Sequence, residues 1–253
     1  DGIDPVEEVF FVTVIPVNDT PVIDLPDEGF TFPENGQLAV DFDQYIYDVD
    51  FDNYLISLVN ETDNIYALIN ASQVTFNSQN YWNGNEALVF SVNDQQGRAI
   101  DIDTVMVYVT PVNNPPYIAN AIPDLEIMEN SFDVSINLDL VFADFDTDPL
   151  LNYNVNDSLS YSFYEEGEND FIVTIEEGAV TIAPIQNWYG IKMLYFVATD
   201  TMGDTAVDST MITVVSVNYS PVVILDIPDL EELEDFADFS INLDLHFDDQ
   251  DGD

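Results

Sequence analysis

The chain repeats itself with a period of about 100 residues, which restricts it to tandem copies of one small domain. Similar seams of the form Val-Asn-x-x-Pro occupy residues 17–21, 112–116 and 217–221. Their asparagines are 95 and 105 residues apart. Later in the repeat, a second pair of matching motifs has its own spacing: a Trp-Asn-Gly motif lies 106 residues before a Trp-Tyr-Gly motif. Both sets of motifs predict domains of one kind joined at the seams.

Within each repeat, apolar residues recur at every second position over short runs. Residues 88–92 and 105–109 show this pattern, which is typical of strands with one buried face. Further apolar runs lie at 74–76, 171–175, 194–198 and 211–215. No segment shows a sustained helical period with caps. About seven short strands per repeat predict an all-β chain of tandem antiparallel β-sandwich domains, immunoglobulin-like in architecture and arranged end to end.

The seams divide the chain into two complete repeats and two partial ones. Residues 19–113 and 114–218 are each expected to form a whole repeat. Residues 1–18 align with the last strand of a repeat, and residues 219–253 align with the first strands of the next. We therefore expect this chain to be a segment of a longer array.

Acidic residues dominate the charge. The 253 residues include 50 Asp and Glu against two Lys and Arg, and the formal net charge is -48. Such a charge repels nucleic acid and anionic membranes, so neither is expected as a partner. No apolar run approaches the roughly 18 residues of a membrane span, so no membrane insertion is expected in this segment. The charge fits saline, calcium-containing surroundings, and salt adaptation alone is the alternative interpretation.

Three aspartate strings recur at the same place in the repeat, at residues 48–52, 144–148 and 249–253. Carboxylates on alternate residues repel by up to roughly 4 kcal/mol per close pair at an effective dielectric constant near 20, so repeated clustering requires a counter-charge. Calcium fits, because it binds carboxylate, amide and carbonyl oxygens. The chain has no Cys, and the lone His246 cannot form a zinc site by itself. The alternative is that these aspartates only form turns.

Several motifs together resemble the cadherin-like tandem repeats of large bacterial and archaeal surface proteins and, more distantly, animal cadherins. They are Glu34-Asn35 near the start of a repeat, Asp-x-Asp at 48–50, Asp-x-x-Gly at 94–97 and the Asn-containing linker. The resemblance covers essentially the whole chain. It implies that these groups meet at domain junctions and bind calcium, which stiffens the array.

Carried over residue by residue, the resemblance implies calcium ligands at three junctions. The first junction has Asn18, Asp19, Asp48, Asp50 and Asp94. The second has Glu34, Asn113, Asn114, Asp144, Asp146 and Asp200. The third has Glu129, Asn218, Asp249 and Asp251. Asp52, Asp148 and Asp253, the third members of the strings, are weaker candidates.

The linker itself changes along the chain. Asp19 becomes Asn114 in the second seam and Tyr219 in the third. The later junctions therefore have fewer charged ligands, and we expect them to hold fewer or weaker ions.

The sequence favours a structural role over a catalytic one. It lacks a His to activate a Ser, a Cys nucleophile and a Gly-rich phosphate loop, and its paired carboxylates recur in every repeat. We therefore expect a noncatalytic, extracellular rod, a cell-surface segment of a giant adhesin, stalk or filament. Its partners would be neighbouring repeats, with calcium rigidifying the junctions.

Two alternatives remain open from the sequence. One is a subunit of a self-assembling surface filament or layer. The other is a module that binds a glycan or a surface protein, with calcium only structural. Trp82 and Trp188 are the candidate sugar platforms in that case, although a repeated aromatic residue before a strand is more often part of the sandwich packing.

Overall fold

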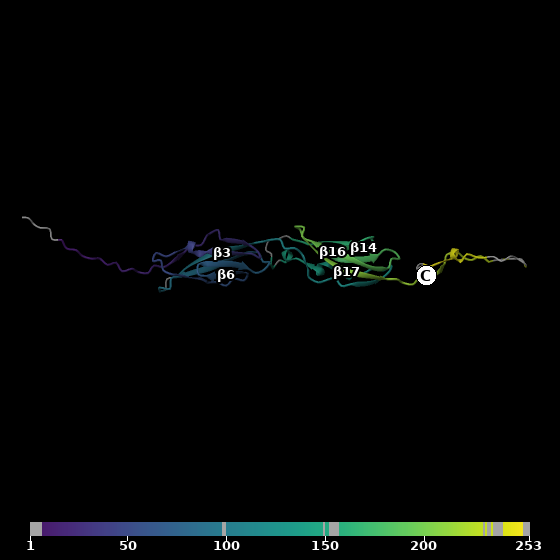
Figure 1. Cartoon of the computed structure of the whole chain (residues 1–253), viewed down its shortest axis with the longest axis horizontal. Coiled ribbons are helices and arrows are strands. Elements are labelled where there is room, and N and C mark those ends of the chain that lie inside the picture. The colour runs from purple at the N-terminus through teal and green to yellow at the C-terminus, as the bar shows by residue number, and fades with distance from the viewer. Residues whose placement is uncertain are drawn as a thin grey trace, which may run out of the picture. The chain divides into compact units, whose positions relative to one another are not determined.

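The computed structural model describes residues 7–97, 100–148, 150–151, 157–229, 231, 234 and 240–249. The chain forms two compact units (Figure 1): unit 1 comprises Asp1–Val112 and Asp148–Val155, and unit 2 comprises Asn113–Thr147 and Asn156–Asp253. Both are built of strands, which confirms the predicted all-β sandwich class. No helix in the described residues is long and apolar enough to cross a membrane.

Unit 1 packs a four-stranded sheet, ordered β2-β9-β8-β5, against a three-stranded sheet, ordered β3-β7-β6. The pairs are antiparallel except β2 with β9, which run parallel. A short β1–β4 pair completes the unit. The bounds are β1 Val22–Ile23, β2 Phe30–Pro33, β3 Gln37–Asp41, η1 Phe42–Tyr45, β4 Ile46–Tyr47, β5 Leu55–Leu58, β6 Ile65–Asn70, β7 Gln73–Ser78, β8 Gly84–Asn93 and β9 Ile100–Thr110.

Unit 2 repeats this plan with a four-stranded sheet, ordered β11-β17-β16-β13, and a β14–β15 hairpin. The pair β11 with β17 is again parallel. The bounds are β10 Tyr117–Ile118, β11 Leu125–Met128, α1 Leu138–Val141, β12 Phe142–Ala143, η2 Phe145–Thr147, β13 Ser160–Glu165, β14 Phe171–Glu176, β15 Ala179–Pro184, β16 Gly190–Thr199 and β17 Thr205–Val215. The C-terminal part has β18 Val222–Val223, η3 Leu243–Leu245 and β19 Phe247–Asp248.

The two units differ at one sheet edge. In unit 1, β3 pairs with β7 along its whole length. In unit 2, two isolated bridges, Asp133 with Ile182 and Asn137 with Ala179, hold the equivalent segment. The side chain of Asn137 caps α1 by accepting a hydrogen bond from the Asp139 N–H. Asp41 caps η1 in the same way in unit 1, so the two units differ in the strand pairing that precedes this turn and not in the turn itself.

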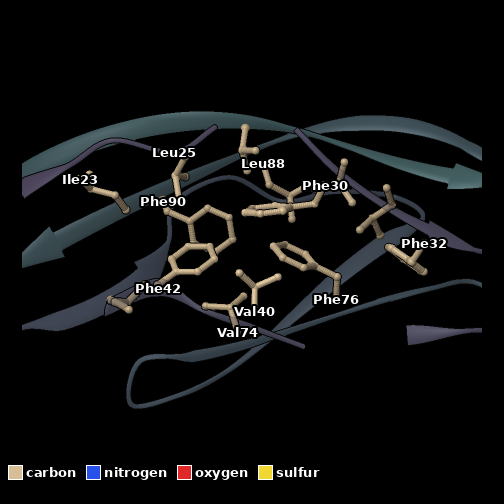
Figure 2. Packing of buried hydrophobic residues seen from close by; sticks show 14 of the residues in the cluster. Ile23, Leu25, Phe30, Phe32, Val40, Phe42, Val74, Phe76, Leu88 and Phe90 are labelled. Atoms are coloured by element: carbon tan, nitrogen blue, oxygen red, sulfur yellow. The ribbon is translucent and has the colours of Figure 1, made fainter. Parts of the chain in front are cut away.

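Large aromatic side chains fill the core of unit 1. Phe42, Phe76 and Phe90 are fully buried, and Figure 2 shows them between the two sheets. The rings of Phe42 and Phe90 meet edge to face with their centroids 5.0 Å apart, a favoured aromatic geometry. Phe196 occupies the equivalent place in unit 2 and is also fully buried.

The Trp-x-Gly motif belongs to this packing in unit 1. Trp82 is 9% exposed and lies in the core cluster. A Cβ at Gly84 would lie 2.7 Å from the Trp82 ring, so the missing side chain lets the indole lie against the backbone. Trp188, which is half-buried, meets Phe171 edge-on with centroids 5.2 Å apart. Burial leaves Trp82 little surface on which a sugar ring can stack.

We expect Phe90→Ala to destabilise unit 1 by about 3–5 kcal/mol, because it removes a fully buried ring and leaves a cavity. Thermal unfolding followed by circular dichroism measures the change. Phe51→Ala is the control, since Phe51 is 89% exposed and its loss should change stability by no more than about 0.5 kcal/mol. Equal effects of the two substitutions would contradict the described core.

Candidate metal centre

Three aspartates converge in unit 2. Asp144 follows β12, Asp157 precedes β13 and Asp200 follows β16. One carboxylate oxygen from each lies within 4.8 Å of the others. Both salt bridges of the described residues are made by Lys192 to other acids, so no basic side chain in that part of the chain pairs with these three. We call them the unit 2 trio.

Backbone hydrogen bonds hold one oxygen of each member in place. Asp144 Oδ1 accepts the N–H of Asp146 at 2.8 Å, and Asp200 Oδ1 accepts the N–H of Met202 at 2.9 Å. Asp157 Oδ1 accepts the N–H of Thr201 at 3.0 Å. These are loop-forming bonds of the kind that the turn interpretation predicts.

The Oδ2 atoms of Asp144 and Asp157 are not explained by turn formation. Asp144 Oδ2 and Asp157 Oδ2 are buried and have no hydrogen-bond partner. Asp144 as a whole is only 4% exposed. A buried carboxylate oxygen without a partner carries a substantial desolvation cost. Two of them in one cluster are the arrangement that a bound cation would stabilise.

The raised pKa of Asp144 reflects the same desolvation cost. Burial raises the pKa of Asp144 to about 6, and repulsion from Asp146, Asp157 and Asp200 adds to the increase, against a lowering by the hydrogen bond from the Asp146 N–H. The protein therefore disfavours the ionised form of this group when no cation is bound.

Asp200 shifts the opposite way. Burial is the largest single effect and raises its pKa, but hydrogen bonds led by the Asn113 side chain outweigh it and the net pKa is lowered. Asp200 thus stays ionised beside Asp144. The trio combines a firmly anionic member with one whose charge requires compensation.

Within unit 2, the linker residues of the second seam bond to Asp200 of the trio and to Asp146 beside it. Asn113 Nδ2 donates to Asp200 Oδ2 at 2.9 Å. The N–H of Asn114 donates to Asp146 Oδ2 at 2.6 Å, and Asp146 is buried. Five of the six residues predicted for this junction, all but Glu34, are therefore linked to one another in unit 2.

Unit 1 has equivalent linker hydrogen bonds around its own seam. Asn18 Nδ2 donates to Asp94 Oδ2 at 2.7 Å, and this bond is the main cause of a lowered Asp94 pKa. The N–H of Asp19 donates to Asp50 Oδ2 at 2.7 Å, and the N–H of Asp50 donates to Asp48 Oδ1 at 2.8 Å. Asp48 Oδ2 is again buried without a partner. The five residues predicted for the first junction are thus linked by hydrogen bonds.

Sequence reasoning missed Asp157. The strand register reveals it. Leu55 at the start of β5 pairs with Asn93, and Ser160 at the start of β13 pairs with Thr199, so Leu55 and Ser160 are equivalent. Asp52 and Asp157 each lie three residues before these positions and are therefore equivalent too. The aspartate strings of the sequence align Asp52 with Asp148 instead. In the described residues, Asp48, Asp52 and Asp94 do not converge as the unit 2 trio does.

The two glutamates are buried at equivalent places. Glu34 is 3% exposed and its Oε2 accepts from Asn83 Nδ2 at 3.1 Å. Glu129 is 6% exposed and its Oε1 accepts the N–H of Val217 at 2.7 Å. Glu34 lies in unit 1, so its meeting with the unit 2 ligands stays a prediction.

The remaining predicted ligands surround the third seam. Asn218 Nδ2 donates to the Tyr219 carbonyl at 3.1 Å. Asp249 lines a hollow of about 570 Å³ together with Tyr219 and Asn187. Asp251 lies outside the described residues. His246 belongs to this region as well, with Nδ1 2.8 Å from the Leu225 carbonyl oxygen.

Comparison with known proteins gives the fold. No protein-family model matches the chain, and no curated protein matches it significantly. The EC1-2 domains of human mucin-like protocadherin match 78% of this chain and 98% of their own, at 14% identity and a TM-score of 0.51. Mouse cadherin-23 EC22-24 matches 78% of this chain and 65% of its own, at 18% identity and a TM-score of 0.47. The fold is cadherin-like, as the sequence motifs implied.

An enzyme also appears among the similar structures. An endo-fucoidan hydrolase from glycoside hydrolase family 107 matches 78% of this chain at 14% identity, with a TM-score of 0.35. This chain spans 29% of the length of that hydrolase. The likeness carries no argument about activity.

We expect Asp144→Asn to stabilise the calcium-free protein at pH 7.5 and not at pH 4. A raised folded-state pKa means that stability from this group falls as pH rises from about 4 to 6, and Asn removes that loss. The gain should be on the order of 1 kcal/mol once solvent screening is included. Melting temperatures in chelator at the two pH values measure it. A destabilised variant at pH 7.5 would contradict the assigned cost.

Proposed function

We propose that the chain is a noncatalytic segment of an extracellular rod whose β-sandwich units bind calcium. The supporting observation is the pair of buried, unpartnered oxygens on Asp144 and Asp157 within the unit 2 trio. Their Oδ1 atoms already accept backbone N–H groups. A cation at the Oδ2 atoms satisfies both carboxylates at once.

Calcium is the cation that this ligand set favours. Every candidate ligand is a carboxylate, a side-chain amide or a backbone carbonyl, and hard oxygen ligands suit calcium. The chain has no thiolate ligand, and His246 contacts Leu225 instead of an acidic cluster. Extracellular calcium modules bind at about 0.1 to 1 mM, so such sites are filled outside a cell and largely unfilled inside it.

The linker connects calcium to rod stiffness in this proposal. Asn113 is hydrogen-bonded to Asp200, and Asn114 to Asp146, so an ion in the trio immobilises the start of unit 2. Glu34, buried in unit 1, is the proposed ligand from the preceding unit. Without calcium the carboxylates repel one another and the linker loosens. Neighbouring repeats are then the principal partners of each unit.

Calcium titration by calorimetry tests the site. We expect saturable binding, and we expect Asp157→Asn to weaken it at least tenfold, because an Oδ2 ligand with no other partner is lost. Asp148→Asn is the matched control: it belongs to the sequence string but lies outside the trio, and its Oδ1 caps the Leu150 N–H. Equal losses in both variants would show that the string, and not the trio, holds the ion.

X-ray scattering on the same samples tests the rod. Calcium should lengthen and narrow the distribution of particle dimensions, and chelator should reverse this. Binding without any change in dimensions would leave calcium as a structural ion within a unit and would remove the stiffening mechanism.

Side-by-side self-assembly is the second candidate function. On the outer face of β13, β16 and β17, Tyr164 and Tyr195 stack with centroids 4.7 Å apart, and Met193 pairs with Met211 across the strands. The outward residues of these three strands are all uncharged: Ser160, Ser162, Tyr164, Ile191, Met193, Tyr195, Val197, Thr199, Thr205, Val207, Ser209, Met211, Thr213 and Val215. Contact through these strands would place no carboxylate directly against another, although Glu126 of the neighbouring strand β11 pairs with Thr213.

Sedimentation velocity over a range of protein concentrations, with calcium present, tests this candidate. We expect association that Tyr195→Asp weakens at least tenfold, because a buried charge would then face the second copy. Thr174→Asp adds the same charge at an exposed site on β14 and should leave association unchanged. A monomer at all concentrations would exclude assembly through this face.

A further inference from the structure

The single lysine of the chain is held against two carboxylates. Lys192 lies on β16, with a side chain only 13% exposed. Its Nζ is 2.6 Å from Asp170 Oδ2 and 3.0 Å from Glu165 Oε2. The ammonium also donates to the carbonyl of Glu168. An amine and two carboxyl groups thus share one enclosed site.

The equivalent site in unit 1 has no amine. Glu86, the third residue of β8, stands where Lys192 is the third residue of β16. Glu86 accepts the N–H groups of Asn64 and Ile65 at the start of β6. In both units the third residue of this long strand thus bonds to the segment at the start of the facing hairpin. In unit 1 it does so through hydrogen bonds from backbone N–H groups, and in unit 2 through ion pairs. Only the unit 2 site combines a nucleophile with a carboxyl carbon.

The groups come from both layers of the sandwich. Lys192 and Glu165 belong to β16 and β13 of the four-stranded sheet, whereas Asp170 directly precedes β14 of the hairpin; β14 and β16 are labelled in Figure 1. A bond between Lys192 and Asp170 would join the two sheets covalently. The chain has no cysteine with which a disulfide could do this.

We propose that Lys192 and Asp170 condense to an intramolecular amide, with Glu165 as the proton carrier. The Lys192 ammonium gives a proton to the Glu165 carboxylate, and the free amine attacks Cγ of Asp170. The new Nζ–Cγ bond forms as a Cγ–O bond breaks. The departing oxygen takes one proton from Glu165 and one from the nitrogen and leaves as water. Glu165 ends ionised, so one ammonium and one carboxylate become one amide and one water.

Enclosure favours this step. Glu165 has a side chain only 4% exposed, and Asp170 one 17% exposed, so little water competes for the carboxyl carbon. Fixed neighbours react at effective concentrations of about 10⁵ to 10⁸ M, which offsets the unfavourable equilibrium of amide formation in water. Hydrogen bonding to Asp170, and to Glu165, raises the pKa of Lys192 against the effect of burial. The resting pair is therefore ionic, and the proton transfer to Glu165 is the step that starts the reaction.

Trypsin gives a direct test, because the chain has one other trypsin site, Arg98. The protein is purified, its intact mass is measured, and it is denatured before digestion. An amide lowers the intact mass by one water and blocks cleavage after Lys192, so two fragments result instead of three. Fragmentation of the larger product must place the bond at Asp170.

Three variants separate the roles. Asp170→Ala and Glu165→Gln should each restore the full mass and the third fragment. Lys192→Arg should also give the full mass and three fragments, since trypsin cleaves after arginine. Wild-type protein with full mass and three fragments overturns the proposal, as does a bond located at Glu165. An amide that still forms in Glu165→Gln overturns the role of Glu165. None of these results depends on calcium.

Discussion

Repulsion between carboxylates is the main constraint on this structure, because the sequence has 50 acidic residues and only two basic ones. The outward residues of β13, β16 and β17 accordingly carry no charge. Where carboxylates do meet, as Asp144 and Asp200 do, something other than a basic side chain must compensate them. The buried oxygens without a partner on Asp48, Asp144 and Asp157 lie near the seams, which supports the proposed calcium sites.

Backbone N–H groups act as the internal substitute for lysine and arginine. Asp101 and Asp103 on β9 accept the N–H groups of Ile23 and Leu25 at 2.9 and 2.6 Å. Asp208 on β17 does the same for Ile122 in unit 2 at 2.7 Å. Each bond ties the first segment of a unit to its longest strand. These acidic side chains therefore accept hydrogen bonds from backbone N–H groups of another segment of the same unit.

Local patterns made much of the fold and part of the site predictable. The alternation at 88–92 and 105–109 corresponds to β8 and β9, and Asp144 and Asp200 lie together as the cadherin-like motifs implied. Asp157 was not predictable in the same way, because more residues separate Asp146 from β13 than separate Asp50 from β5. The aspartate string also continues to Asp148, which does not belong to the trio. The strand register determines which aspartate is the third member of the trio. A sequence motif does not contain the strand register.

The interrupted pairing at the edge of β15 has a mechanical consequence if the chain is pulled from its ends. In unit 1 a continuous β3–β7 ladder must break before the edge segment can leave. In unit 2 the segment is held at two separate places, around Asp133 and around Asn137, by backbone hydrogen bonds to Ile182, Val180 and Gly178. If both units were pulled in series, we would expect the interrupted edge of unit 2 to open before the continuous ladder of unit 1. Because Ile136 and Leu138 of this segment are buried in the core of unit 2, its release would open part of that core and give an array of such units a partial unfolding step.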